Sequence, residues 1–124
     1  MARRGNATFV GFGFGPIQAG LFCYAGMQSG VFRHLVVAEI APEIVAEVRA
    51  AGGQYKLNVA HLDHVETVTV GPIQIENPAE YADRARLIEA IAAAQEIATA
   101  IPNVRAYRRS GQGSLHRILA QGLQ

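Results

Sequence analysis

The chain has 124 residues, of which 50% are hydrophobic and 17% charged. This size supports one globular domain with an apolar core and leaves no room for a second full domain. The formal net charge is +1, and the basic residues are spread along the chain apart from the pairs Arg3-Arg4 and Arg108-Arg109. The composition therefore argues against nucleic-acid binding.

Cys23 is the single cysteine, which excludes an intramolecular disulfide and means that a thiolate metal site would need ligands from another chain. The apolar run near the N-terminus is interrupted by glycines and lacks the continuous core of a signal peptide. No stretch approaches the length of a membrane span. We therefore expect a cytoplasmic protein without a membrane partner.

The first half of the chain predicts strand, helix, strand, helix. A β-branched and aromatic run at 7–10 indicates a buried strand, and helical spacing of apolar residues follows from Pro16 to Ser29. The near-continuous apolar run at 35–40 is typical of a strand buried on both faces of a parallel sheet. A helix then begins at Pro42 and ends at Gly52-Gly53.

The second half begins with alternation and the turn signal Gly71-Pro72, which predict two or three short strands between 55 and 78. Helix formers then predict a helix at 81–95, followed by a strand at 96–101. A polar loop at 102–113 precedes a last helix at 114–121, with Ser114 as its cap. The expected fold is α/β, with a mostly parallel sheet flanked by helices and a short β excursion around 55–78.

A glycine-rich segment, Gly11 to Gly20, follows the first strand and opens the first helix. This context favours a phosphate-binding turn, because a diphosphate needs close backbone approach and free amides. We expect Gly11 to permit the tight turn and Gly13 to remove the side chain that would face the phosphates, with the helix dipole adding to the attraction. Gly20 is expected to let the helix lie close to the sheet.

Pro16 occupies the place of the third glycine of the usual fingerprint. Proline suits a first helical turn, so the helix start survives and the amides of Phe14, Gly15 and Ile17 remain as donors. The alternative is that the glycines serve only to make the turn. The pattern indicates a Rossmann-like dinucleotide-binding domain spanning 1–124.

Two further positions are candidates for cofactor contact. Glu39, near the end of the second strand, is placed to accept hydrogen bonds from the adenosine ribose hydroxyls and to repel a 2'-phosphate, which predicts NAD over NADP. Thr99 and Ala100 close a later strand with small residues that would let the nicotinamide end pass. The alternatives are an ordinary exposed carboxylate and a plain strand end.

The remaining polar residues give weaker signals. His61, Asp63 and His64 are neighbours in a predicted hairpin loop, where side chains rarely converge on one ion, so no metal site is expected. Cys23 lies mid-helix without an adjacent base and is interpreted as a buried structural thiol.

The sequence resembles the N-terminal Rossmann domain of the mannitol dehydrogenase family, which includes mannitol-1-phosphate 5-dehydrogenase, with Pro16 marking a divergent member. The stretches that carry the resemblance are Phe9 to Gly13, Val37 to Glu39, Tyr55 to Val59 and Ile97 to Ile101. It implies an NAD-dependent oxidoreductase acting on the CH–OH group of a sugar alcohol or its phosphate. It also implies that the catalytic residues lie in a C-terminal helical domain beyond these 124 residues.

The leading hypothesis is thus the NAD(H)-binding domain of a polyol dehydrogenase. On its own, this domain is expected to bind the cofactor but not to catalyse the reaction. It is expected to bind a polyol substrate only together with the missing domain. The alternative is a non-enzymatic dinucleotide-sensing module that regulates a partner through the same site. A sheet cut short would leave an uncovered edge, so we expect a homo-oligomer.

Overall fold

The computed structural model describes residues 5–101 and 115–123. A parallel sheet contains β1 (Ala7–Phe12), β2 (Phe32–Ala38), β5 (Gln74–Glu76) and β6 (Glu96–Thr99), and an antiparallel hairpin contains β3 (Tyr55–Ala60) and β4 (Val65–Val70). The helical segments are η1 (Gln18–Cys23), α1 (Tyr24–Ser29), α2 (Pro42–Ala50), α3 (Tyr81–Ala93) and α5 (Leu115–Gly122). None of the helices in these two ranges is long and apolar enough to cross a bilayer.

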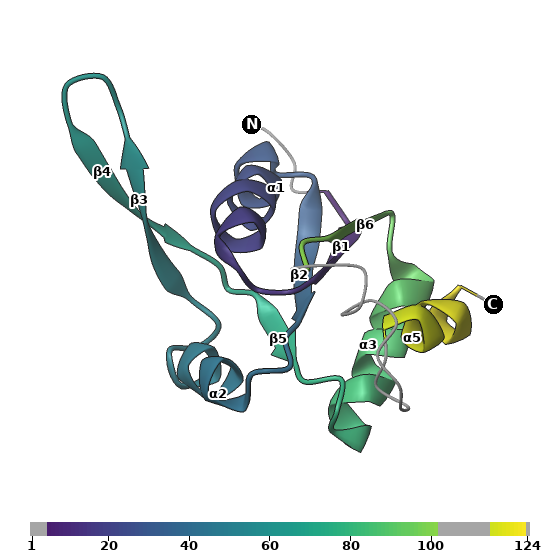
Figure 1. Ribbon diagram of the computed structural model, residues 1–124. Coiled ribbons are helices and arrows are strands. Elements are labelled where there is room, and N and C mark those ends of the chain that lie inside the picture. The colour runs from purple at the N-terminus through teal and green to yellow at the C-terminus, as the bar shows by residue number, and fades with distance from the viewer. Residues whose placement is uncertain (1–4, 102–114, 124) are drawn as a thin grey trace.

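The four-stranded sheet has the order β5-β2-β1-β6, and each neighbouring pair is parallel. The chain thus moves outward from β1 to β2 and β5, then returns to pair β6 with the other side of β1 (Figure 1). This reversal beside β1 is the switch point at which doubly wound sheets bind ligands. The predicted Rossmann-like α/β fold is confirmed.

Helices cover both faces of the sheet and create two apolar cores. On one face, Phe9, Leu35 and Val37 of the strands pack with Cys23 and with α2. On the other, residues alternating with these along the same strands pack on α3 and α5. Because side chains alternate across a strand, only strands apolar at every position can serve two cores, which explains the continuous apolar runs.

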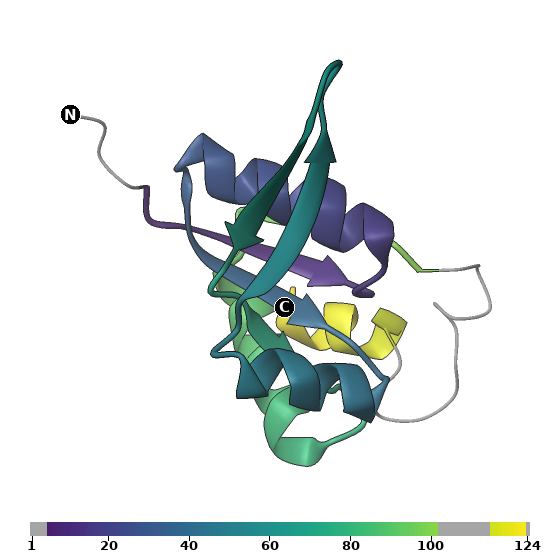
Figure 2. The ribbon, with the colours of Figure 1, turned by 90° about the vertical axis from the view of Figure 1, so that its left-hand side faces the viewer.

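The β excursion is shorter than expected. β3 and β4 pair over six residues, from Tyr55 opposite Val70 to Ala60 opposite Val65, and extend away from the sheet (Figure 2). β5 was predicted as part of the excursion but belongs to the parallel sheet, because Val36 to Ala38 of β2 align with Gln74 to Glu76. Because β5 is short and contains the charged Glu76, its sequence pattern did not distinguish it from the alternating residues before it. The polar loop predicted at 102–113 and the Ser114 cap lie outside the described residues.

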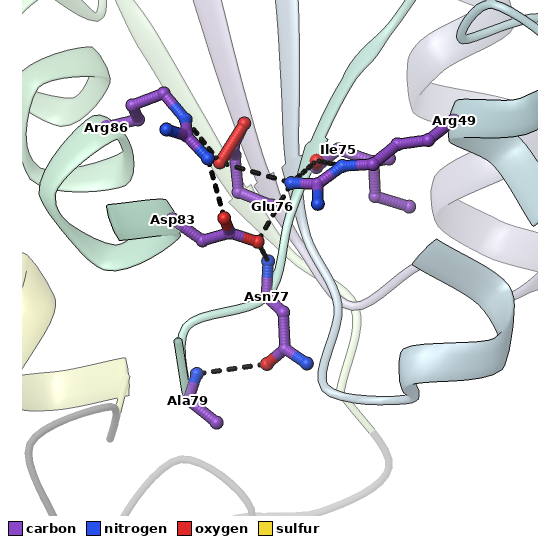
Figure 3. Close-up of polar contacts among 7 residues, drawn as sticks. All are labelled: Arg49, Ile75, Glu76, Asn77, Ala79, Asp83 and Arg86. Atoms are coloured by element: carbon purple, nitrogen blue, oxygen red, sulfur yellow. Dashed lines mark hydrogen bonds and ion pairs between the residues drawn. The ribbon is translucent and has the colours of Figure 1, made fainter. Parts of the chain in front are cut away.

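Buried charges join α2, β5 and α3 at the carboxyl end of β5 (Figure 3). Asp83 accepts hydrogen bonds from Arg49 at 2.8 Å, from Arg86 at 2.6 Å and from the Asn77 amide at 2.8 Å. Glu76 accepts from Arg86 at 2.8 Å. Both carboxylates are nearly inaccessible, at 4% for Glu76 and 5% for Asp83, and each is paired, as buried charges must be. The network therefore fastens two helices to the edge strand.

Replacing Asp83 with Ala should lower the free energy of unfolding by roughly 2 kcal/mol, because the buried Asn77 amide and two arginines lose their acceptor. Urea denaturation followed by circular dichroism would measure the change. Glu89→Ala, on the exposed face of the same helix, is the control and should have little effect. Equal stabilities of the two variants would contradict this account of the network.

Candidate functional site

The carboxyl edge of the sheet brings the predicted cofactor-binding residues together. One residue beyond each strand continues the ladder: the Gly13 amide donates to Ala38 and the Ala100 amide to Phe12, both at 2.8 Å. Glu39 lies in the same row, where its amide donates to Glu76 at 2.9 Å. The glycine turn, the carboxylate after β2 and the end of β6 are therefore neighbours, although they lie far apart in the sequence.

The two glycines expected to act first in the turn have different roles in the structure. Gly11 was predicted to form the turn but lies within β1, and a Cβ there would be 2.5 Å from the side-chain amide carbon of Gln18. The turn is made by Gly13, whose φ is +87°, and its hydrogen atom faces the Ala100 carbonyl rather than open solvent. The expectation was wrong because β1 extends two residues further than predicted, to Phe12.

Gly15 is the glycine with open space in front of it, since a Cβ there would have no heavy atom within 4 Å. Gly13 and Gly15 have the spacing of the first two glycines in the G-x-G-x-x-G fingerprint. The fingerprint therefore begins at Gly13, and Gln18 stands where its third glycine would be. Pro16 is then an ordinary first residue of the helix. Gly20 faces Leu57 of the hairpin, not the sheet as predicted.

Glu39 is held by two backbone amides. Its Oε1 accepts from Phe14 in the glycine turn and its Oε2 from Ala41, both at 2.9 Å. The carboxylate therefore braces the turn and the start of α2, a role that the sequence did not indicate. Each carboxylate oxygen can accept more than one hydrogen bond, so the half-buried group retains capacity toward a ligand.

Donors remain at the start of the helix. Of the three amides expected to be free, that of Phe14 is bonded to Glu39. Within the described ranges, no hydrogen bond engages the amides of Gly15 and Ile17. Pro16 and Ile17 are exposed and so is Thr99 across the edge, while Ala100 is half-buried. An accessible turn with two amides at a helix N-terminus can accept an anion.

Gln18 is the residue of the site that sequence reasoning missed. Its side chain is fully buried, and its Nε2 lies 3.3 Å from the Phe12 carbonyl and 3.4 Å from the Ala98 carbonyl, so that it links β1 to β6 beneath the turn. The signal for it was present in Gly11, because a glycine inside a strand pattern marks a close approach by another group.

The helix behind the turn is widened to a π-helix over Gln18–Cys23. Tyr55, at the base of the hairpin, donates its hydroxyl to the Ala19 carbonyl at 2.6 Å, and its ring packs edge-on against Phe14 at 5.0 Å. The hairpin thus contacts the glycine turn directly.

Cys23 is a buried thiol, as predicted. Burial raises its pKa from 9.0 to about 11, against the smaller, lowering effect of a hydrogen bond with Tyr55. Burial also raises the pKa of the Tyr55 hydroxyl, with a further contribution from Cys23. A thiol that stays protonated at neutral pH is a poor nucleophile, so this cysteine is structural.

Two other features lie away from the glycine turn. At the hairpin tip, His61 pairs with Glu66 at 2.9 Å and His64 with Asp63 at 2.6 Å, so each imidazole has its own carboxylate. A shallow depression borders the edge strand β5 and is lined by residues that include Arg49 and Glu76, which already belong to the charge network. Neither has the features of a cofactor site.

No protein-family model matches the sequence, and no curated protein matches it significantly.

Gly13→Ala and Gly15→Ala should separate the two glycine roles. An added Cβ at Gly13 combines a positive φ with an approach of 2.6 Å to the Ala100 carbonyl, and it should lower the free energy of unfolding by about 2–4 kcal/mol. Gly15→Ala meets open space and should leave stability nearly unchanged. Thermal or urea unfolding measures both, and a Gly15→Ala variant as unstable as Gly13→Ala would refute the assignment.

The stability of the chain should fall between pH 9 and pH 11. The Cys23 thiol ionises near pH 9.0 in the unfolded chain but only near pH 11 in the folded one, so the unfolded state loses its proton first and is favoured as the pH rises. Urea denaturation at several pH values would measure the slope. In Cys23→Ala this slope should be shallower, and identical slopes would contradict the assignment.

Proposed function

We propose that the chain is an NAD(H)-binding domain of an oxidoreductase. The observation that supports this most directly is the bond of 2.9 Å between the Glu39 carboxylate and the Phe14 amide, which places an acidic group at the end of β2 beside the glycine turn at the end of β1. In dinucleotide-binding folds these two places receive the adenosine ribose and the diphosphate.

The surrounding geometry supports the same proposal. The Gly15 and Ile17 amides at the helix start would bind the diphosphate, since they are free of other bonds within the described residues. The half-buried Glu39 would accept from the ribose hydroxyls with its remaining lone pairs and repel a 2'-phosphate. Thr99 and Ala100, across the turn at the end of β6, would border the nicotinamide half.

The reaction class that we propose is oxidation of a CH–OH group of a sugar alcohol or its phosphate, and this part rests on the resemblance described above. In that family the base that removes the alcohol proton belongs to a helical C-terminal domain. The residues at this sheet edge would therefore supply binding and orientation of the cofactor, while the hydride chemistry belongs to the nicotinamide when it is bound.

Calorimetric titration of the chain with NADH and NADPH tests the proposal. The wild type should bind NADH more tightly than NADPH. Glu39→Gln should reduce that preference by about tenfold, equal to roughly 1.4 kcal/mol, because the charge that repels the 2'-phosphate is removed. The ratio of the two affinities is the informative quantity, since loss of the brace to Phe14 would weaken both nucleotides together.

Glu43→Gln is the matched control, because it removes the same charge from an exposed position in the first turn of α2. Its preference for NADH should equal that of the wild type. Failure of a folded wild-type chain to bind either nucleotide would refute the proposed function. A preference unchanged in Glu39→Gln would show that Glu39 only braces the turn.

A further inference from the structure

Gln18 and Gly11 form a pair that reverses the usual arrangement of a dinucleotide-binding turn. In the usual fingerprint the third glycine lies on the helix and allows it to pack closely on the strand. Here the helix carries a glutamine at that position, and the strand carries the glycine. The three heavy atoms nearest to a Cβ on Gly11 would all belong to the Gln18 side-chain amide, with its carbon and nitrogen at 2.5 Å and its oxygen at 2.7 Å.

The amide of Gln18 also makes polar contacts, in addition to filling this space. Its Nε2 interacts with carbonyls of two adjacent strands, Phe12 of β1 and Ala98 of β6. Its Oε1 is buried and has no hydrogen-bond partner among the described residues. An apolar side chain of the same length would fill the site without burying an unpaired oxygen, so packing alone does not account for an amide here.

We propose that Gln18 is a positioning residue of the dinucleotide site. It fixes the first turn of the helix against the ends of β1 and β6, and so holds the Gly15 and Ile17 amides where a diphosphate would receive them. The second part of this inference rests on the proposed function. The first part, that Gln18 orders the turn, concerns the protein without ligand.

Gln18→Met is the principal variant, because methionine keeps the length of the side chain and removes its amide. NMR relaxation of the Gly13, Gly15 and Ile17 amides should show greater mobility than in the wild type. The Kd for NADH should rise about tenfold, the size expected when one buried hydrogen bond is lost. Gly11→Ala should act in the same way, because its methyl group displaces the Gln18 amide.

Two further variants complete the design. Ile91→Val, in the core between α3 and the sheet, controls for a general loss of stability and should change neither turn mobility nor Kd. In the double variant Gly11→Ala/Gln18→Gly the methyl group has space, so its loss of stability should be smaller than the sum of the two single losses.

The outcomes separate this inference from the proposed function. Turn amides of unchanged mobility in Gln18→Met would overturn the positioning role, whether or not NADH binds. A wild type that binds no NADH, with a turn that becomes mobile in Gln18→Met, would refute the proposed function and the diphosphate part, while Gln18 would retain its ordering role. An unchanged Kd in a Gln18→Met chain with a mobile turn would also overturn the diphosphate part.

Discussion

The parallel pairing of β1 with a strand on each side is the constraint on which the rest of the structure depends. Its register with β2 and β6 ends at Phe12, opposite Ala38 and Thr99. The next residue of each strand therefore lies at the same edge of the sheet, and the turn that leaves β1 lies between the ends of β2 and β6. Gly13 makes this turn with a positive φ while lying against the Ala100 carbonyl, a combination that a residue with a side chain could adopt only with strain.

The turn is then fastened from several directions. Glu39 holds it from the β2 side through the Phe14 amide, and Gln18 holds the first helical turn from below through carbonyls of β1 and β6. Tyr55 of the hairpin packs its ring against Phe14 in the turn and donates its hydroxyl to the Ala19 carbonyl in the helix that follows. These contacts come from segments widely separated in sequence, so the arrangement of the turn is a product of the complete fold. Preorganisation of this kind lowers the cost of binding, because the donors need not be ordered when a ligand arrives.

Charge is used differently at the two strand ends. After β2, the single carboxylate of Glu39 is half-buried, and its hydrogen-bond partners among the described residues are two backbone amides. At the carboxyl end of β5, Glu76 and Asp83 are buried and neutralised by two arginines. The first arrangement leaves an acidic group near the turn, whereas in the second the carboxylates are paired with arginines that join two helices to the sheet. Their different surroundings make Glu39 the better candidate for ligand contact.

The sequence by itself determined the fold class and most elements, because strands buried on two faces must be apolar throughout and Pro16 and Pro42 are favourable in the first turn of a helix. It also placed Glu39 and the glycines at strand ends. Only the tertiary structure decided that β5 joins the parallel sheet, that Gly13 rather than Gly11 makes the turn, and that Gln18 is buried beneath it. These three results depend on which segments approach one another, and local periodicity carries no information on contacts between distant residues.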